Sequence, residues 1–408
     1  MGQLPSPCGG KMGEVPGFLI TDIDDETLSK MAKVVAKCMN MRKGESAWIR
    51  SGLHTWRFAE HIRYELFMQG VTCVATFSSD WFVEKAYKDV PKEYFAMTPK
   101  EEKALAEAVD AVITIEQPWD PLVMARLPRE KLDARTAGFY PVRRTILSKK
   151  WCYVGYPSEP MARSFGIPYD DLKRLIVNGI LYDQEKLRSD CDKVAKALKG
   201  ADWVHIKDEF GTDLELRITG RRINKDDAII SDEDVAISDT GSNLPAGEVF
   251  IAPIETEGEG KLYCPLTRDR FTRRIIRGVE LVFKDGHLML DKCKAEENEE
   301  DLKKSIESCM KIDEEKVRKG EIPELRTINV AELGIGLNMS IDKAIGYILT
   351  DEKIGGSVHV AIGANKTYGG TSESTLHWDF VTAPKATIEV IYIDGSSKVI
   401  MEEGKLTI

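Results

Sequence analysis

Residues 46–77, SAWIRSGLHTWRFAEHIRYELFMQGVTCVATF, decide the fold class of the first half of the chain. A strand is predicted for SAWIR at the start of this stretch, and another for the β-rich VTCVATF at its end. Between them, Thr55 to Met68 have a helical pattern, and Gly70 follows it. A strand, a helix and a second strand in succession are typical of a βαβ unit. The stretch therefore predicts a parallel sheet.

The segments on either side continue this alternation of helices and strands. Residues 25–39 place Leu28, Met31 and Val35 at helical spacing, with Asp25 as the expected N-cap. Further helices are predicted at 98–109, 129–147 and 169–199, and further strands at 110–116 and 150–156. This order predicts an α/β N-terminal domain built on a parallel sheet.

The second half of the chain is richer in strands. Residues 202–223 and 279–295 have the pattern of strand pairs around glycine-containing turns, and residues 386–408 that of a hairpin. One clear helix is predicted at 297–312. Because 408 residues exceed what a single hydrophobic core usually supports, we expect two domains. We expect an α/β domain over residues 1–200 and a β-rich α+β domain over residues 201–408.

Composition excludes several classes of protein. The formal net charge of -10 argues against a general nucleic-acid binder, because phosphate contacts need clustered lysine and arginine. No apolar run reaches the roughly 18 residues of a membrane span, and the Gly- and Pro-rich N-terminus does not resemble a signal peptide. The eight cysteines contain no C-x-x-C pair. We therefore expect a cytoplasmic protein with reduced cysteines, bound neither to membrane nor to nucleic acid.

Polar residues recur in four short apolar segments of the second half. Two of the segments are LPAGEVFIAP at 244–253, with Glu248, and INVAELGIG at 328–336, with Glu332 at the end of a predicted strand. The others are DEKIGGSVHVAIGAN at 351–365, with Glu352 and His359, and STLHWDF at 374–380, with His377 and Asp379. On a strand, His377 and Asp379 project from the same face. Taken singly, these groups are compatible with surface charges or with a self-satisfied pair in a core.

Taken together, the four segments offer three glutamates, one aspartate and two histidines. Such oxygen and nitrogen donors without a thiolate suit Zn, Co, Mn or Fe. Six ligands are more than one catalytic metal with an open position usually employs, so the set favours two ions. No P-loop, G-x-S-x-G elbow or H-E-x-x-H motif is present, and His54 and His61 are interpreted as packing or surface residues.

The four segments, in this order and at these separations, closely resemble the aminopeptidase T, aminopeptidase S and PepS family of dinuclear metallo-aminopeptidases. The resemblance implies an α/β domain followed by a β-rich catalytic domain, usually in a homodimer. It also implies two divalent metal ions (Zn, Co, Mn or Mg), peptide substrates with a free N-terminus, and hydrolysis by a metal-activated water. By resemblance, the metal-ligand positions are Glu248, Glu332, His359, His377 and Asp379, with Glu332 as the bridging carboxylate and Glu352 as a further ligand.

One position departs from the family pattern. The best-known members have a functional tyrosine shortly after the first histidine, whereas here Tyr368 stands at a slightly different offset, in GANKTYGG. We carry Tyr368 over as a proton donor or oxyanion stabiliser beside the catalytic Glu332. The competing interpretation is an ordinary loop tyrosine beside Gly369 and Gly370.

Two other functions remain open at this stage. A subgroup that resembles the same family consists of mononuclear Fe(II) dioxygenases that open a dihydroxypyridine ring. Its iron would be held here by His359, His377 and Asp379. The presence of both Glu248 and Glu332 favours the two-metal peptidase over this alternative. The other alternative is a scaffold protein that has kept the fold without the activity.

Overall fold

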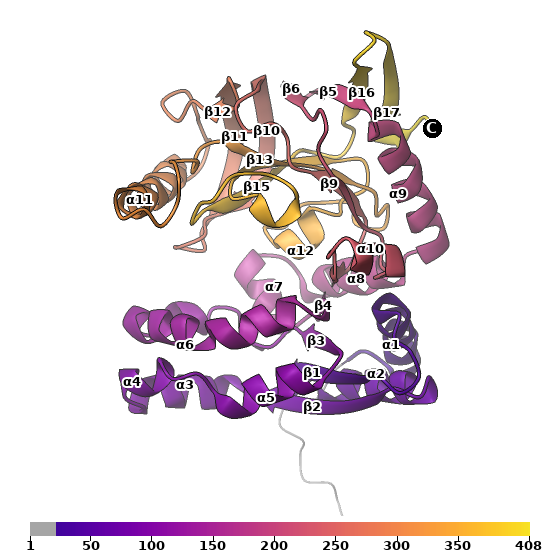
Figure 1. The fold of residues 1–408 in the computed structure, drawn as a ribbon, viewed down its shortest axis with the longest axis vertical. Helices are drawn as coiled ribbons and strands as arrows, with labels where there is room; N and C mark the ends of the chain where they lie inside the picture. Colours follow the sequence, from indigo (N-terminus) through magenta and orange to yellow (C-terminus); the bar gives the residue numbers. More distant parts are fainter. Residues whose placement is uncertain (1–21) are drawn as a thin grey trace, which may run out of the picture.

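The computed structural model describes residues 22–408, and its two halves lie one above the other in Figure 1. The first half is at the bottom of that view and the second half at the top, with α7 and α8 at their junction. The expectations for the N-terminal segment and for Cys8 lie outside the described residues. No helix within residues 22–408 is long and apolar enough to cross a membrane.

The first sheet is parallel, with the strand order β2-β1-β3-β4-β8. Its strands are β1 (Ser46–Gly52), β2 (Thr72–Ser78), β3 (Ala111–Ile115), β4 (Lys150–Val154) and β8 (Gly241–Leu244). Helix α2 (Trp56–Met68) connects β1 to β2. The pairing of β1 with β2 confirms the predicted βαβ unit.

Strand β8 comes from the second half of the sequence and yet completes this first sheet. It pairs with β4 at Trp151↔Gly241, where a β-carbon on Gly241 would lie 2.1 Å from Cζ2 of Trp151. A four-residue strand that begins with glycine has too little apolar alternation to be recognised in a sequence. The chain therefore returns to the first sheet after residue 200. The expected domain boundary between residues 200 and 201 stays a prediction.

Helices surround this sheet and also join the two halves. The α-helices other than α2 are α1 (Asp25–Met39), α3 (Asp80–Asp89), α4 (Lys92–Phe95), α5 (Lys100–Ala108), α6 (Arg129–Leu147), α7 (Glu159–Phe165), α8 (Tyr169–Leu181), α9 (Gln184–Leu198), α10 (Asp232–Ala236), α11 (Glu299–Arg318) and α12 (Ile348–Asp351). The described residues also include the 3₁₀ turns η2 (Leu53–Thr55), η3 (Met124–Arg126) and η4 (Lys366–Tyr368).

Two helix predictions are wrong in detail. Asp24, not Asp25, caps α1, because its carboxylate accepts the backbone N–H of Thr27 at 2.8 Å. The single helix expected at 169–199 is two helices. Tyr182 is extended between them, and the Asp183 carboxylate starts α9 by accepting the N–H groups of residues 185 and 186 at 3.0 Å each.

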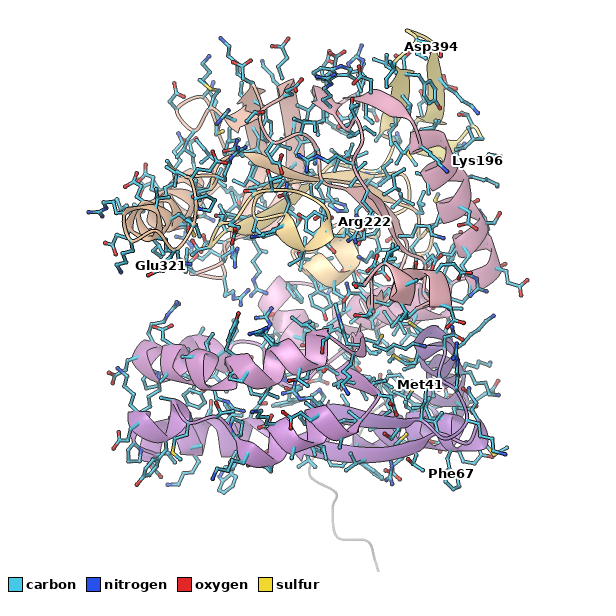
Figure 2. The ribbon with its side chains drawn as sticks, viewed as in Figure 1. Met41, Phe67, Lys196, Arg222, Glu321 and Asp394 are labelled. Carbon is cyan, nitrogen blue, oxygen red and sulfur yellow. The ribbon has the colours of Figure 1, made fainter. Side chains whose placement is uncertain are left out.

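The second half contains two antiparallel sheets. The larger has the order β12-β11-β10-β6-β5-β16-β17-β18, and the smaller β15-β14-β13-β9-β7. The larger sheet consists of β5 (Ala201–Lys207), β6 (Asp213–Arg217), β10 (Gly258–Arg268), β11 (Ile275–Lys284), β12 (His287–Leu288), β16 (Thr387–Tyr392), β17 (Ser397–Glu402) and β18 (Lys405–Leu406). The smaller consists of β7 (Ile223–Asp226), β9 (Glu248–Ile251), β13 (Val330–Gly336), β14 (Val358–Gly363) and β15 (His377–Val381). Figure 2 shows Asp394 at the tip of the predicted β16–β17 hairpin.

The two antiparallel sheets pack against each other through apolar side chains. Leu376, Trp378 and Phe380 are buried, and the Trp378 indole N–H donates to the Thr267 hydroxyl of β10 at 3.0 Å. These residues alternate along the chain with His377 and Asp379. One face of β15 therefore belongs to the core, which leaves the other face free for polar chemistry.

Candidate metal centre

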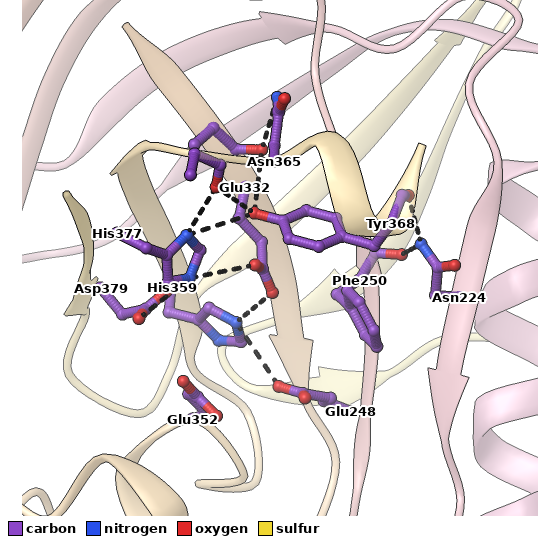
Figure 3. A network of polar contacts seen from close by, with 12 residues as sticks. Asn224, Glu248, Phe250, Glu332, Glu352, His359, Asn365, Tyr368, His377 and Asp379 are labelled. Atoms are coloured by element: carbon purple, nitrogen blue, oxygen red, sulfur yellow. Dashed lines mark hydrogen bonds and ion pairs between the residues drawn. The ribbon is translucent and has the colours of Figure 1, made fainter. Parts of the chain in front are cut away.

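Strand register brings five candidate residues to one face of the smaller sheet (Figure 3). Glu248 begins β9, Glu332 lies in β13, His359 in β14, and His377 and Asp379 in β15. The pairs Gly336↔Glu248, Gly334↔His359, Glu332↔Ala361, Ala361↔Asp379 and Gly363↔His377 stand directly opposite each other. Because opposite residues of an antiparallel pair share a face, the five side chains converge.

Glu332 lies inside β13, not at its end as expected. The pairing of β13 with β14 shifts register between Val330 and Glu332, which is a β-bulge. Bulges redirect side chains and are frequent beside active sites. All seven residues of β13 are buried, so the Glu332 carboxylate is held among the other candidates and away from bulk water.

Two glycines of the ELGIG segment make room on this face. A β-carbon on Gly334 would lie 2.0 Å from the His359 ring, and one on Gly336 would lie 2.1 Å from the carbonyl oxygen of Ile354. The first glycine therefore seats the imidazole. The second lets the segment that follows α12 approach the sheet, which brings Glu352 beside the cluster (Figure 3).

The two oxygens of the Glu332 carboxylate face different histidines. Its Oε1 is 3.4 Å from Nε2 of His359, and its Oε2 is 3.5 Å from Nε2 of His377. On one side, Glu248 Oε2 is also 3.4 Å from Nε2 of His359. On the other, Asp379 Oδ2 is 3.4 Å from Nε2 of His377. Glu332 thus stands between two groups of donor atoms.

The carboxylates control the charge of both histidines. Burial by itself lowers the pKa of His359, but the carboxylates of Glu332 and Glu248 outweigh it and raise that pKa to about 9. Burial likewise lowers the pKa of His377, while Asp379 and Glu332 raise it to about 10. In return, His377 holds the pKa of Asp379 below its ordinary value despite burial. The cluster therefore stabilises positive charge.

Lys353 is a further member of the cluster that the sequence analysis missed. Its side chain is fully buried, and its Nζ lies 2.5 Å from Glu248 Oε1, 3.2 Å from Glu352 Oε2 and 3.4 Å from Asp226 Oδ2. A buried lysine is rare without such partners. The sequence offers no local signal for this burial, because Lys353 follows Asp351 and Glu352 and reads as part of a charged surface segment.

Glu352 forms an ion pair with Lys353 at 3.2 Å, and within residues 22–408 it forms no ion pair with either histidine. Burial raises its pKa to about 8, with Glu248 and Asp379 adding to the rise and Lys353 opposing it. Figure 3 shows its carboxylate next to His359. Glu352 is therefore at the edge of the cluster rather than at its centre.

Tyr368 lies on η4 with its hydroxyl against His377. Its oxygen is 3.3 Å from Nδ1 of His377, and the hydroxyl donates to the carbonyl of Ala364 at 3.2 Å. Nδ1 of His377 is 2.9 Å from that same carbonyl oxygen. Burial, reinforced by Glu332 and Asp379, raises the pKa of Tyr368, which keeps the hydroxyl protonated. The altered offset in the sequence thus still places a tyrosine at the cluster.

A buried carboxylate holds the loop that carries Tyr368. Glu255 accepts the side-chain N–H of Asn365 at 3.0 Å and the backbone N–H of Thr371 at 2.6 Å. Asn224 in turn donates to the carbonyl of Tyr368 at 3.1 Å. No local sequence pattern predicts this support, because Glu255 lies more than 100 residues before the loop.

His54 and His61, which were interpreted as packing or surface residues, lie outside the cluster. His54 is buried in η2, and burial lowers its pKa to about 4. His61 on α2 is 3.2 Å from Asp25. Both belong to the first half of the chain, in agreement with packing and surface roles.

The donor atoms of the cluster fit a divalent metal ion. Glu332, His377 and Asp379 each offer one atom within 4.8 Å of the others. Glu248 Oε2 and Asp379 Oδ1 are buried and accept no hydrogen bond within residues 22–408. Buried carboxylate oxygens without a donor are costly unless a cation satisfies them. A cluster of carboxylates and imidazoles without thiolate matches Zn, Mn, Co or Fe.

Comparison with protein families decides which group of enzymes this cluster represents. The family model described as "Thermophilic metalloprotease (M29)" matches residues 24–406. The chain belongs to the M29 family. Its activity is therefore that of a metal-dependent peptidase, and the resemblance inferred from the four segments is confirmed. No curated protein sequence matches the chain.

Two solved structures have the same fold as this M29 chain. Wild-type AmpT from Thermus thermophilus is 17% identical with a TM-score of 0.73, covering 94% of this chain and 99% of its own. The 2,5-dihydroxypyridine dioxygenase from Pseudomonas putida is 14% identical with a TM-score of 0.55, covering 94% of this chain and 98% of its own. The likeness to AmpT confirms an α/β domain followed by a β-rich domain.

Proposed function

We propose that this M29 chain is a metallo-aminopeptidase that removes N-terminal residues from peptides with the help of two divalent metal ions. The proposal rests on the position of the Glu332 carboxylate between two histidines. Its Oε1 lies 3.4 Å from Nε2 of His359, and its Oε2 lies 3.5 Å from Nε2 of His377. A carboxylate with one oxygen in each of two donor groups has the arrangement of a bridging ligand. This supports the expected role of Glu332.

The two donor groups define the proposed ligand sets. Glu248, His359 and Oε1 of Glu332 would hold one ion, and Oε2 of Glu332, His377 and Asp379 the other. Glu352 would complete the set from its position beside His359. When bound, such ions polarise the scissile carbonyl and lower the pKa of a bridging water. We propose that both ions are divalent and come from the group Zn, Co, Mn and Mg.

The chain's own residues then supply position and protons. The Tyr368 hydroxyl, kept protonated by its raised pKa, is a donor for the oxyanion that develops as water adds to the peptide carbonyl. Lys353 holds the carboxylates of Glu248 and Glu352 in position through its ion pairs with them. Glu248, Glu332, His359 and Asp379 are buried, which limits the access of bulk water to the reacting bond.

The test combines metal counting with activity. Chelated protein is reloaded with Zn, Co, Mn, Mg or Fe(II), and hydrolysis of a panel of aminoacyl anilides is measured with elemental analysis of each sample. We expect two ions per chain at saturation and hydrolysis only after reloading. Glu332→Gln should lower turnover at least about 100-fold while the fold is retained.

A matched control for Glu332→Gln is Glu315→Gln on α11, where the side chain is 62% exposed. It should leave turnover unchanged. A near-normal rate for Glu332→Gln, or no more than one ion per chain at saturation, would contradict the two-metal proposal.

The second candidate is a mononuclear Fe(II) dioxygenase. It is favoured by the structural likeness to the Pseudomonas putida enzyme and by the presence of His359, His377 and Asp379. The placement of Glu248 and Glu332 beside these residues favours the peptidase, because three ligands suffice for such an iron site. Oxygen consumption with 2,5-dihydroxypyridine and Fe(II), measured beside the anilide assay, distinguishes the two.

A homodimer and a cytoplasmic location also belong to the proposal. Trp81 and Phe82 on α3 are 72% and 60% exposed, and large exposed aromatic groups are typical of surfaces that a partner covers. The seven cysteines of the described chain are free, as in a reducing compartment. Light scattering on wild type and on the Trp81→Ser, Phe82→Ser double variant tests the dimer, since loss of α3 contacts should yield monomers.

A further inference from the structure

A cavity of about 470 Å³ lies directly beside the candidate metal centre. Glu352, His377 and Asp379 line one part of it. Its other walls include Arg268 at the end of β10 and Arg270 and Arg273 in the loop 269–274 that leads to β11. One cavity therefore joins a carboxylate-rich region to an arginine-rich region.

Among the residues that the structure describes, the three arginines have no carboxylate partner. Within the described chain, none of them forms an ion pair at 4 Å or less, although many other arginines on this protein do. Arg268 donates to the backbone carbonyls of Arg273 and Ser164, at 2.7 and 3.2 Å, and stacks over Phe165 at 4.7 Å. Arg270 donates to the carbonyl of His377 at 2.7 Å. The side chain of Arg273 makes no hydrogen bond within residues 22–408.

The contacts divide the three arginines by role. Arg268 is used structurally, because it ties β10 to α7 of the first half. Arg270 donates to the backbone carbonyl of His377, and it lines the same cavity as the His377 and Asp379 side chains of the candidate metal centre. Arg273 is exposed, and its side chain has no competing partner in the described part of the chain. Arg270 and Arg273 are thus the cations that remain available to a ligand in the cavity.

The loop that presents these cations is held in place from inside the protein. Asp269 is fully buried, and its carboxylate accepts the backbone N–H of Phe271 at 2.8 Å and a hydrogen bond from Ser305 on α11. Arg268 clamps the far end of the loop at the carbonyl of Arg273. A fixed loop loses little conformational entropy when its side chains bind a ligand.

We propose that Arg270 and Arg273 bind a carboxylate of the peptide on the leaving-group side of the cleaved bond, so that the enzyme prefers short peptides with a free C-terminus or an acidic residue after that bond. The inference rests on the proposed aminopeptidase function and names its substrate class. Guanidinium groups recognise carboxylates through charge-assisted and often bidentate hydrogen bonds. The peptide's amino end would lie at the metal centre, and its carboxylate at the arginines.

The walls between the two charged regions agree with a short peptide. Leu122, Met161 and Phe165 of the first half line the same cavity as Trp378 and Val381 of β15. The volume falls within the range of pockets that enclose small ligands. An apolar wall between the two charged regions suits an apolar side chain of the peptide.

The test compares substrates that differ only in one carboxylate. The metal-loaded full-length protein is assayed with Leu-Gly and Leu-Gly-amide, and with Leu-Glu-amide and Leu-Gln-amide. The first pair reports on the terminal carboxylate, and the second on an acidic side chain. We expect kcat/KM to be about 10- to 100-fold higher for the charged member of at least one pair, mainly through a lower KM, as for a hydrogen bond to a charged group.

Variants assign that preference to the arginines. Arg273→Gln, and separately Arg270→Gln, should reduce the ratio between charged and neutral substrates towards one, and Arg273→Lys should restore part of it. Arg318→Gln on α11, where the side chain is 75% exposed, is the matched control and should keep the ratio of the wild type.

The outcomes separate this inference from the proposed function. If all four substrates are cleaved at equal rates, or if Arg273→Gln and Arg270→Gln both keep the wild-type ratio, the carboxylate site is refuted while the aminopeptidase stands. If no substrate and no aminoacyl anilide is hydrolysed after metal loading, the proposed function itself has failed. A preference in the first pair alone identifies the terminal carboxylate, and one in the second pair alone the acidic side chain.

Discussion

The imidazole of His359 lies directly over the α-carbon of Gly334. The two residues are opposite each other on β13 and β14, and a β-carbon on Gly334 would lie 2.0 Å from both Cε1 and Nε2 of the ring. Real β-carbons do not approach other atoms so closely. The glycine is therefore required by the position of one candidate ligand, which links the ELGIG segment to the candidate metal centre.

Gly334→Ala should displace His359 from the cluster. Overpacking of a dense core usually costs about 1–3 kcal/mol in the free energy of unfolding. Because His359 is one of the proposed ligands, we also expect metal affinity to fall by at least about 10-fold. Chemical denaturation of the chelated protein and metal titration measure the two effects.

The clash can be isolated with a double-mutant cycle. In a His359→Ala background the ring is gone, so Gly334→Ala should cost much less than it does in the wild type. An equal cost in both backgrounds would mean that some other contact of Gly334 is responsible.

Tyr368→Phe tests the tyrosine whose offset departs from the family pattern. Removal of a donor to a developing oxyanion typically lowers kcat about 100- to 1,000-fold. We expect this loss with metal content unchanged, because the hydroxyl is not among the proposed ligands. Tyr392→Phe is the control, since its hydroxyl donates to the carbonyl of Ala197, far from the cluster, at 2.8 Å. Loss of metal in Tyr368→Phe would instead make the hydroxyl a ligand.

The sequence was most informative where pattern and local geometry coincide. The strand–helix–strand order of residues 46–77 predicted the parallel sheet, and the period-two spacing of His377 and Asp379 predicted their common face. Both depend on residues close in the chain. Strand β8 was missed for the opposite reason, since its four residues join a sheet whose other members end near residue 154.

The remainder of the site depends on long-range packing that no local pattern records. Lys353 was passed over because a lysine beside an acidic residue usually lies on the surface, and only the fold shows that Asp226 and Glu248 surround it. The arginines of the cavity are likewise ordinary charged loop residues in the sequence. Only the fold shows that Arg270 contacts β15, which is more than 100 residues away in the chain.

Lys353→Met should destabilise the protein strongly. The substitution keeps the length of the side chain but leaves Asp226, Glu248 and Glu352 without their buried cation. Removing one partner of a buried ion pair typically costs about 3–5 kcal/mol, because the remaining charge is uncompensated. Bound metal should recover part of this loss, since Glu248 is a proposed ligand. Denaturation curves without metal measure the loss of unfolding free energy, and curves with metal measure how much of it is recovered.

Lys366→Met provides the comparison for Lys353→Met. Lys366 pairs with Glu373 at 2.6 Å on the surface, where its side chain is 63% exposed. Such pairs contribute at most about 1 kcal/mol. Similar losses for the two variants would show that the burial of Lys353 has no energetic consequence.

The acid stability of the protein should depend on His54. This side chain is 6% exposed, its Nε2 has no hydrogen-bond partner in the described chain, and burial lowers its pKa to about 4. An unfolded histidine has a pKa near 6.5. Between about pH 6.5 and pH 4 the unfolded chain therefore binds a proton at His54 that the folded chain does not. Stability consequently falls as the pH falls through this window.

The expected loss is about 3 kcal/mol over the whole window, at about 1.4 kcal/mol for each pH unit of difference between the two states. His54→Phe removes the titrating group while keeping a ring beside Tyr156. The free energy of unfolding of both proteins is measured from pH 7 to pH 4 after chelation, so that carboxylates titrating in the same range contribute equally and cancel in the difference. The wild type should lose about 3 kcal/mol more than the variant. Parallel curves would show that His54 takes up its proton in the folded protein as readily as in the unfolded chain.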